Sequence, residues 1–174
     1  MRAVREGDLT RMGVLFERHH RPLFDFLYRM TGDRGAAEDL VQDVFVRMLR
    51  YRATYRDEGK FETWMFRIAR NVRADHFRKH SGAVYVPEDD TEWVSDAPGP
   101  GHLLERARDL VRLKRALQSL REDRRELIVL VRYRGMSHEQ VGAILGVDSG
   151  TVKVRFHRAL KELRDAFARV PEGD

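Results

Sequence analysis

Cationic side chains recur at helical spacing within residues 61–80, FETWMFRIARNVRADHFRKH. At about 100° per residue, one stripe of this segment holds Arg67, Asn71, Ala74 and Arg78, and a separate apolar stripe begins at Phe61. Guanidinium groups bind phosphate, and the small Ala74 would let a nucleic-acid backbone or base come close. The plainer interpretation is a basic core helix. Both interpretations can hold, because the apolar and cationic residues fall on different faces.

The segment before this helix, YRATYRDEGK (residues 51–60), combines tyrosines with cations. Aromatic rings stack on unpaired bases while cations follow the backbone, and each stacked base contributes about 1–3 kcal/mol. Loop and helix together therefore predict a site for single-stranded nucleic acid. Its candidate contacts are Tyr55, Arg56, Lys60, Arg67, Arg70, Asn71 and Arg78.

A second candidate site lies in MSHEQVGAILGVDSGTVKVRFHRAL, which begins at residue 136. Ser137 followed by Gln140 is typical of a capping box, and Gly146 suits the left-handed residue of a tight turn. Asp148 can then cap a longer helix, which completes a helix-turn-helix layout. The outward face of that longer helix would enter the major groove of DNA. This face and its edges comprise Gly150, Thr151, Lys153, Val154, His157, Arg158 and Lys161. The alternative is a solvated amphipathic helix within a helical bundle.

An acidic stripe distinguishes the helix predicted from residue 33 to about residue 50. Its members are Asp39, Gln42, Asp43 and Val46. Acidic residues early in a helix favour its positive end by about 0.3–1 kcal/mol each, which explains Asp39 but not Asp43. Because a negative stripe would repel phosphate, we interpret it as a surface for docking a protein.

The composition argues against several other functions. The chain has 174 residues and no cysteine, so thiol catalysis, disulfides and zinc-thiolate sites are impossible. His76 and His80 have the spacing of a zinc motif, but the residue at 77 is Phe rather than the required Glu. We predict no catalytic residue, no metal site, no cofactor and no enzymatic activity. No apolar run reaches the ~18 residues of a membrane span, so a cytoplasmic location is expected.

The helical periodicity predicts an all-α protein of two small domains joined by an acidic, flexible linker. Helices are expected over about 9–30, 33–50, 61–80, 103–120 and 123–133, before the helix-turn-helix. The first should bend or break at Pro22 and end at Gly32, after which Asp33 can cap the second. The apolar, core-facing side of the first helix comprises Leu9, Met12, Phe16, Leu23, Leu27 and Met30. Residues 81–101 hold five acidic residues and neither Lys nor Arg, whereas residues 1–80 and 102–174 each carry a net charge of +5. The proline and glycine content of 81–101 is typical of a linker.

Three stretches, in this order, resemble the extracytoplasmic-function (ECF, group 4) sigma factors of the bacterial sigma-70 family. They are FLYRMTGDRGAAEDLVQDVFVRML, FETWMFRIARN and the helix-turn-helix segment, and the resemblance extends from about Leu9 to Phe167. It implies that residues 1–80 are sigma region 2 and residues 102–174 are sigma region 4. It also implies that the acidic stripe docks on the clamp coiled coil of core RNA polymerase.

The resemblance further implies that the single-strand site opens the promoter −10 element and captures a flipped base near Asn71. The helix-turn-helix would read the −35 element, with Lys153, Val154, His157 and Arg158 at contact positions. Val154 and Ser149 depart from the Ser and Glu that are frequent in the family, so the −35 sequence stays open. The family also implies an anti-sigma factor as partner, a monomer when free of polymerase, and association with the nucleoid in the holoenzyme.

The linker length agrees with this assignment. Elements about 25 base pairs apart are separated by roughly 85 Å of duplex at ~3.4 Å each. A coil of 21 residues spans about 25 Å on average and roughly 70 Å when extended. The two domains of the free protein should therefore lie closer together than on DNA. Rival hypotheses are a stand-alone helix-turn-helix regulator and a purely regulatory protein-binding module.

Overall fold

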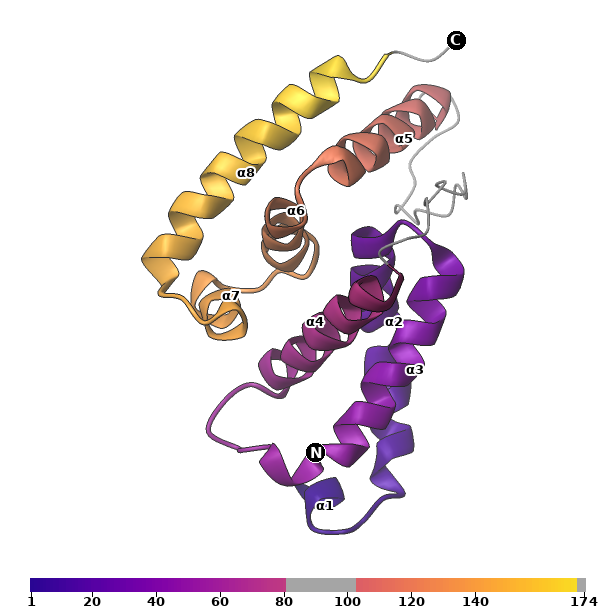
Figure 1. Cartoon of the computed structure of the whole chain (residues 1–174), viewed down its shortest axis with the longest axis vertical. Helices are drawn as coiled ribbons and strands as arrows, with labels where there is room; N and C mark the ends of the chain where they lie inside the picture. The colour runs from indigo at the N-terminus through magenta and orange to yellow at the C-terminus, as the bar shows by residue number, and fades with distance from the viewer. Residues whose placement is uncertain (81–102, 172–174) are drawn as a thin grey trace.

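The computed structural model describes residues 1–80 and 103–171, and within these ranges every regular secondary-structure element is a helix (Figure 1). The N-terminal lobe comprises α1 (Arg2–Arg5), α2 (Arg11–Thr31), α3 (Arg34–Arg50), η1 (Arg52–Thr54) and α4 (Phe61–His80). The C-terminal lobe comprises α5 (Leu103–Ser119), α6 (Glu122–Ile128), η2 (Val129–Tyr133), α7 (His138–Leu145) and α8 (Ser149–Arg169). The all-α prediction is confirmed. The proposed linker, residues 81–101, lies outside the described residues.

The N-terminal lobe is an α2–α3 hairpin with α4 packed across it. Gly32 ends α2 in the left-handed conformation, at φ 77°, and the Asp33 carboxylate accepts a hydrogen bond from Ala36 N to begin α3. Phe26 and Phe66 meet edge to face, with ring centroids 5.2 Å apart, in the core between α2 and α4. Burial of each such side chain contributes about 1.5–3 kcal/mol, so the hairpin and α4 form one packed unit.

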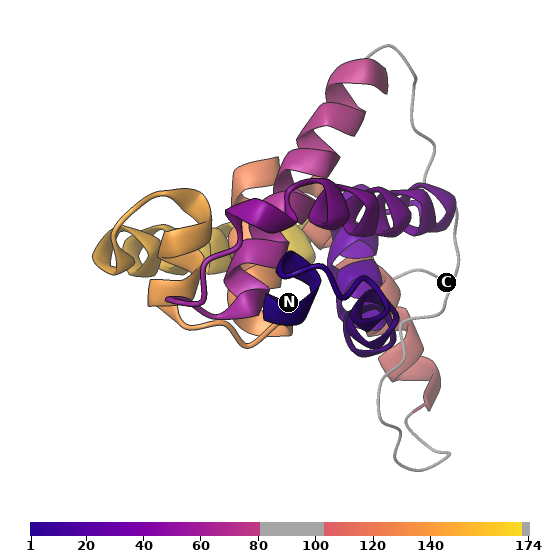
Figure 2. The same ribbon diagram turned by 90° about the horizontal axis from the view of Figure 1, so that it is seen from below.

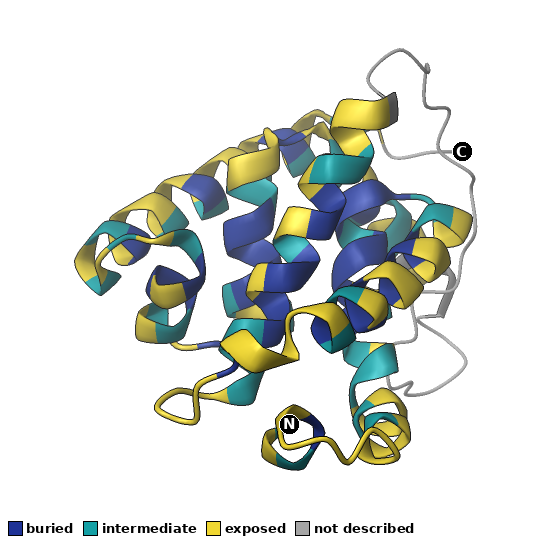
Figure 3. Ribbon diagram, turned by 60° about the horizontal axis from the view of Figure 1, so that its bottom comes forward, coloured by how far each residue is buried: buried dark blue, intermediate teal, exposed yellow. Residues whose placement is uncertain are grey.

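In the C-terminal lobe, α8 packs against α5, α6 and α7. The apolar stripe of α8, opposite the outward face, packs against these helices: Val152 and Ala159 are fully buried, and Phe156 and Leu163 are partly buried. Figure 3 shows buried residues on the sides where helices face one another and exposed residues on their outer sides.

The two lobes are in contact. Helix α4 lies between its own hairpin and α7, and α2 contacts α5, α6 and η2 (Figures 1 and 2). The end of α2 is capped across this contact, because Gln118 donates to Arg29 O at 2.9 Å and Arg125 donates to Met30 O at 2.7 Å. These carbonyls belong to the last turn of α2, where a helix lacks partners of its own. The ammonium of Lys114 also donates to the Tyr28 hydroxyl at 3.0 Å in a buried contact.

Three local expectations need correction. Helix α2 is not broken at Pro22 but continues through it, because packing of its second half around Leu23 and Leu27 outweighs the cost of a proline inside a helix. Leu9, expected on the core face, precedes α2 and is exposed. Phe16, also expected there, contacts the ring of Phe45 but stays 40% exposed.

Candidate functional site

The predicted single-strand site is displayed along one side of α4 and in the loop before it. Arg67, Asn71 and Arg78 are exposed, as the helical stripe required, while Phe66 and Met65 on the other side are fully buried. Arg56 and Lys60 are exposed in the loop, and Arg70 is partly exposed. The apolar and cationic residues of α4 therefore lie on different faces, as the sequence predicted.

Tyr55 is placed differently from the other loop residues. It is only 5% exposed, and its ring lies edge-on to Phe61 and Trp64, with centroids 6.1 and 5.4 Å away. Its hydroxyl donates to Asp57 Oδ1 at 3.1 Å, and Arg5 of α1 donates to its carbonyl at 3.0 Å. In this conformation the ring cannot stack on a base, because doing so would remove it from the core.

Sequence reasoning missed a charge cluster beside Asn71. The Asp75 carboxylate pairs with Arg47 from α3, at 2.5 Å, and with Arg78 one turn further along α4. Hydrogen bonds from Arg47 and Arg78 lower the pKa of Asp75, so it remains a carboxylate. The signal available in the sequence was the i, i+3 spacing of Asp75 and Arg78. The position of Arg47 could not be read from it.

This cluster borders an open pocket of about 630 Å³. Its lining includes Arg47, Asn71, Asp75 and Arg78 from the N-terminal lobe and Glu122 from the C-terminal lobe. Arg47 and Arg78 outweigh the single charge of Asp75, but Glu122 brings the lining of the pocket to two cations and two carboxylates.

The acidic stripe of α3 is exposed as predicted. Asp39, Gln42 and Asp43 face solvent, and Val46 is 55% exposed. These four residues form the α3 docking stripe. The structure therefore presents an acidic face with an apolar member on a different element from the cationic residues of α4.

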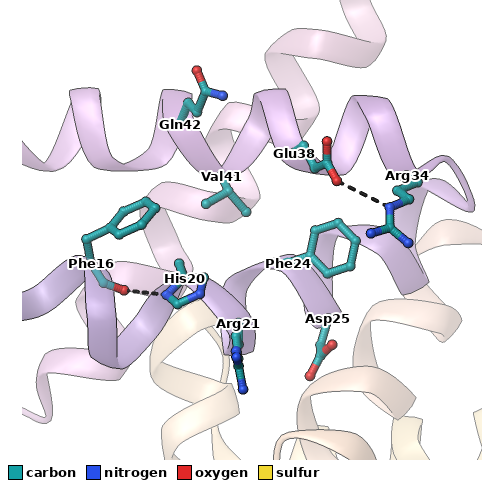
Figure 4. Close-up of a pocket in the computed structure, with 9 residues that line it drawn as sticks. All are labelled: Phe16, His20, Arg21, Phe24, Asp25, Arg34, Glu38, Val41 and Gln42. Atoms are coloured by element: carbon teal, nitrogen blue, oxygen red, sulfur yellow. Dashed lines mark hydrogen bonds and ion pairs between the residues drawn. The ribbon is translucent and has the colours of Figure 1, made fainter. Parts of the chain in front are cut away.

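A groove of about 600 Å³ lies next to this stripe, between α2 and α3 (Figure 4). Phe16, His20 and Phe24 line it from α2, and Val41 and Gln42 line it from α3. The Arg34–Glu38 ion pair, at 3.3 Å, stands at one end. Gln42 belongs to both the groove and the docking stripe, so the two features form one continuous surface. Sequence reasoning missed the groove because it assigned Phe16 to the core.

The helix-turn-helix has the predicted local geometry. Both bonds of the capping box are present, from Gln140 N to Ser137 Oγ at 3.3 Å and from Ser137 N to Gln140 Oε1 at 3.1 Å. Gly146 adopts φ 73°, which directs the chain out of α7. The Asp148 carboxylate then accepts from Thr151 N at 2.8 Å and begins α8. Hydrogen bonds from the Thr151 hydroxyl and amide lower the pKa of Asp148.

Gly142 permits the close approach that this turn requires. Its carbonyl accepts from Gly146 N at 2.8 Å and from Val147 N at 3.0 Å. A Cβ at position 142 would lie 2.6 Å from Val147 O, closer than such atoms approach. The sequence analysis did not single out Gly142, although a small residue inside a short helix of this motif was a usable signal.

The outward face of α8 is open. The exposed residues are Gly150, Lys153, Val154, His157, Arg158 and Lys161. Thr151 is only partly exposed and its hydroxyl is engaged by Asp148, so it serves the helix start. The face combines cations that can hold phosphates with Arg158 and His157, which can donate to base edges in the major groove.

Within residues 1–80 and 103–171, no three His, Cys, Asp or Glu side chains come together as a metal site. No helix in the same ranges is long and apolar enough to cross a bilayer.

Both lobes match known families. Residues 15–82 match Sigma-70 region 2, and residues 110–163 match Sigma-70, region 4. The chain is 34% identical to RNA polymerase sigma factor CarQ of Myxococcus xanthus over 98% of this chain and 97% of that protein. It is 36% identical to ECF RNA polymerase sigma factor SigF of Caulobacter vibrioides over 96% and 87%. It is 35% identical to ECF RNA polymerase sigma factor SigE of Mycolicibacterium smegmatis, of which it spans 61%.

Solved structures of similar chains have the same fold. The sigma factor RpoE of Bartonella quintana, in complex with the anti-sigma factor NepR, is 27% identical with a TM-score of 0.70, over 91% of this chain and 98% of that one. CnrH, in complex with the cytosolic domain of CnrY, is 25% identical with a TM-score of 0.72, over 97% and 95%. With its α3 docking stripe, basic α4 face and helix-turn-helix, the chain belongs to the ECF group of the sigma-70 family.

Proposed function

We propose that this protein is a promoter-specificity subunit that binds core RNA polymerase, reads the −35 element with α8 and holds the opened −10 element on α4. The observation that carries the proposal is the presence of three exposed faces of different chemistry on one chain. The α3 docking stripe is acidic with an apolar member, α4 is cationic with Asn71, and α8 is a cationic helix that follows a capped turn. An isolated repressor has no use for an acidic face beside a single-strand site.

Each face has a distinct part in initiation. The α3 docking stripe binds the clamp coiled coil of the polymerase, and the adjoining groove extends that contact. Lys153 and Lys161 hold phosphates while Arg158 and His157 contact base edges of duplex −35 DNA. At −10, capture of a flipped base beside Asn71 offsets the cost of unpairing it through new stacking and hydrogen bonds. Arg67, Arg70 and Arg78 hold the backbone of that strand.

Several finer assignments accompany this proposal. Residues 1–80 constitute region 2, residues 102–174 constitute region 4, and the chain belongs to group 4 of the family. The protein catalyses no covalent chemistry and acts in the cytoplasm, on the nucleoid once in the holoenzyme. An anti-sigma factor is its regulatory partner, which is supported by the complexes in which the similar structures were solved.

Run-off transcription tests the proposal. Purified core polymerase with this chain should start transcription at mapped sites on genomic fragments of its own organism, while core polymerase alone should not. Absence of any specific start would refute it. A gel-shift assay separates the rival, because a stand-alone regulator binds duplex promoter DNA without polymerase, whereas a sigma factor binds it strongly only with the core enzyme.

A further inference from the structure

Residues 55–60, termed here the melting loop, have few hydrogen bonds of their own. Within the described ranges, the backbone amides of residues 56–60 donate to no other backbone group. The melting loop connects η1 to α4 and carries the exposed cations Arg56 and Lys60, which we assign to the −10 strand. A loop without internal bonds loses conformational freedom when it binds a ligand. That loss weakens binding unless other groups order the loop beforehand.

Helix α1 supplies bonds that the melting loop does not make itself. Arg5 Nη1 donates to Tyr55 O at 3.0 Å, and Arg2 forms an ion pair with Asp57. Val4, between the two arginines in the sequence, is fully buried, and α1 contacts both α2 and η1. The two arginines therefore belong to an element that is itself packed on the N-terminal lobe, and they bind the loop from there.

Tyr55 and Asp57 complete this arrangement from within the melting loop. The Tyr55 hydroxyl donates to Asp57 Oδ1 at 3.1 Å, while Arg2 binds Oδ2 of the same carboxylate. The Tyr55 ring packs edge-on against Phe61 and Trp64 of α4. The loop is therefore held to α1 at one carbonyl and one carboxylate, and to α4 at one aromatic ring.

The ion pair between Arg2 and Asp57 also changes the charge that the melting loop presents. Asp57 directly follows Arg56, and an unpaired carboxylate there would repel the phosphates that Arg56 is placed to hold. The side chains of Arg2 and Asp57 are 67% and 37% exposed, so the pair contributes little to folding. We therefore expect its effect on the binding of a strand rather than on the stability of the chain.

We propose that Arg2 and Arg5 are positioning residues for the −10 strand, because α1 orders the melting loop before the strand binds and neutralises Asp57. Neither arginine contacts the nucleic acid, since each acts through a residue of the loop. Tyr55, expected from the sequence to stack on a base, is instead the residue at which α1 and α4 both hold the loop. This inference rests on the proposed function, because it takes the binding of the −10 strand to the N-terminal lobe from there.

Proteolysis of the free protein tests the order of the melting loop independently of transcription. The protease Glu-C cleaves after glutamate, and Glu58 is exposed in the loop, outside any helix. Arg5→Met keeps the aliphatic stem but removes the donor to Tyr55 O, so cleavage after Glu58 should become about tenfold faster. Arg11→Met is the matched control, because it removes the same charge and breaks an exposed pair with Asp8 outside the loop. An unchanged cleavage rate in Arg5→Met would overturn the inference.

Strand opening by the holoenzyme tests the consequence of that order. On a promoter mapped by run-off transcription, Arg5→Met should lower the rate at which −10 becomes reactive to permanganate about tenfold. Affinity for core polymerase and the circular dichroism spectrum should match those of Arg11→Met. On a promoter with a pre-opened −10 bubble, the slope of log binding constant against log salt concentration should stay unchanged, whereas loss of a direct phosphate contact lowers it by about 1. A lowered slope, or normal opening despite faster cleavage after Glu58, would contradict the positioning role.

A double variant tests the pairing of Arg2 with Asp57. Arg2→Met leaves the Asp57 carboxylate unpaired beside the strand and should slow opening about two- to fivefold. Asp57→Asn in the same chain removes that charge but keeps an amide oxygen for the Tyr55 hydroxyl, so opening should recover. Normal opening in Arg2→Met, or no recovery in the double variant, would refute the neutralising role of Arg2. None of these results touches the proposed function, which fails only if run-off transcription with the parent chain fails.

Discussion

Replacement of Gly142 by alanine should destabilise the protein although alanine favours helices. The added Cβ would lie 2.6 Å from Val147 O, so the turn must shift by about 0.4 Å to reach even the 3.0 Å limit. The obstacle is backbone rather than a flexible side chain. The same backbone carries the two bonds from Gly146 N and Val147 N to Gly142 O, at 2.8 and 3.0 Å.

The expected magnitude follows from these opposing effects. Overpacking costs about 1–3 kcal/mol, and weakening two turn hydrogen bonds costs up to about 1 kcal/mol each. The higher helix propensity of alanine returns about 1 kcal/mol. The net loss of unfolding free energy should lie between about 0 and 4 kcal/mol, with a central value of about 2 kcal/mol. Each kcal/mol lowers Tm by about 2–4 °C in a chain of this length.

Urea denaturation followed by circular dichroism measures this loss, and Gly13→Ala is the matched control. Gly13 lies inside α2, and a Cβ there would meet nothing within 4 Å, so alanine should raise the unfolding free energy by up to about 1 kcal/mol. Because the shifted turn sets α8 relative to α7, Gly142→Ala should also weaken holoenzyme binding to duplex −35 DNA. If Gly142→Ala stabilises the chain as Gly13→Ala does, the contact between a Cβ at position 142 and Val147 O does not limit this turn, and the reasoning is refuted.

Three further predictions concern the three faces. Asp39→Arg with Asp43→Arg should abolish binding to core polymerase by reversing the charge of the α3 docking stripe. The circular dichroism spectrum should stay unchanged, because both side chains are exposed. Unchanged affinity in a pull-down would refute the docking assignment. Asn71→Ala should spare formation of the closed promoter complex but impair strand opening, and normal permanganate reactivity at −10 would contradict this. Arg158→Ala should cost about 1–3 kcal/mol of binding free energy for −35 DNA and relax the base preference at one position. Lys161→Ala should weaken binding to all DNA sequences alike and lower the slope of log binding constant against log salt concentration by about 1. If filter binding shows equal effects for both variants, the division of roles is refuted.

Helix starts and ends were predicted correctly where the residues that cap a helix interact with backbone groups only a few positions away. Asp33, Ser137 and Asp148 all begin helices as predicted, and Gly32 and Gly146 end them in the left-handed conformation. A cap is satisfied by backbone groups three residues away, so its partners are already in the sequence. Helical periodicity likewise separated the buried and exposed faces of α4 and α8.

Non-local contacts limited the prediction of the candidate site. Tyr55 was assigned to base stacking because tyrosine beside cations suits that role, but Phe61, Trp64 and α1 enclose it. Phe16 was assigned to the core by its spacing, yet α3 covers it only partly, and a groove results. Periodicity specifies which residues share a face, but it does not say whether a neighbour covers that face.

The sequence by itself determined the family, the order of the helices and the three faces with their charges, because these depend on residue type and short-range spacing. Only the tertiary structure decided which of those faces are covered. Arg73 looked like one more cation on a basic helix, and it proved to be a buried partner of Glu126, fifty-three residues away. A charge pair across lobes leaves no periodic signal, since its partners come together only when separate helices pack.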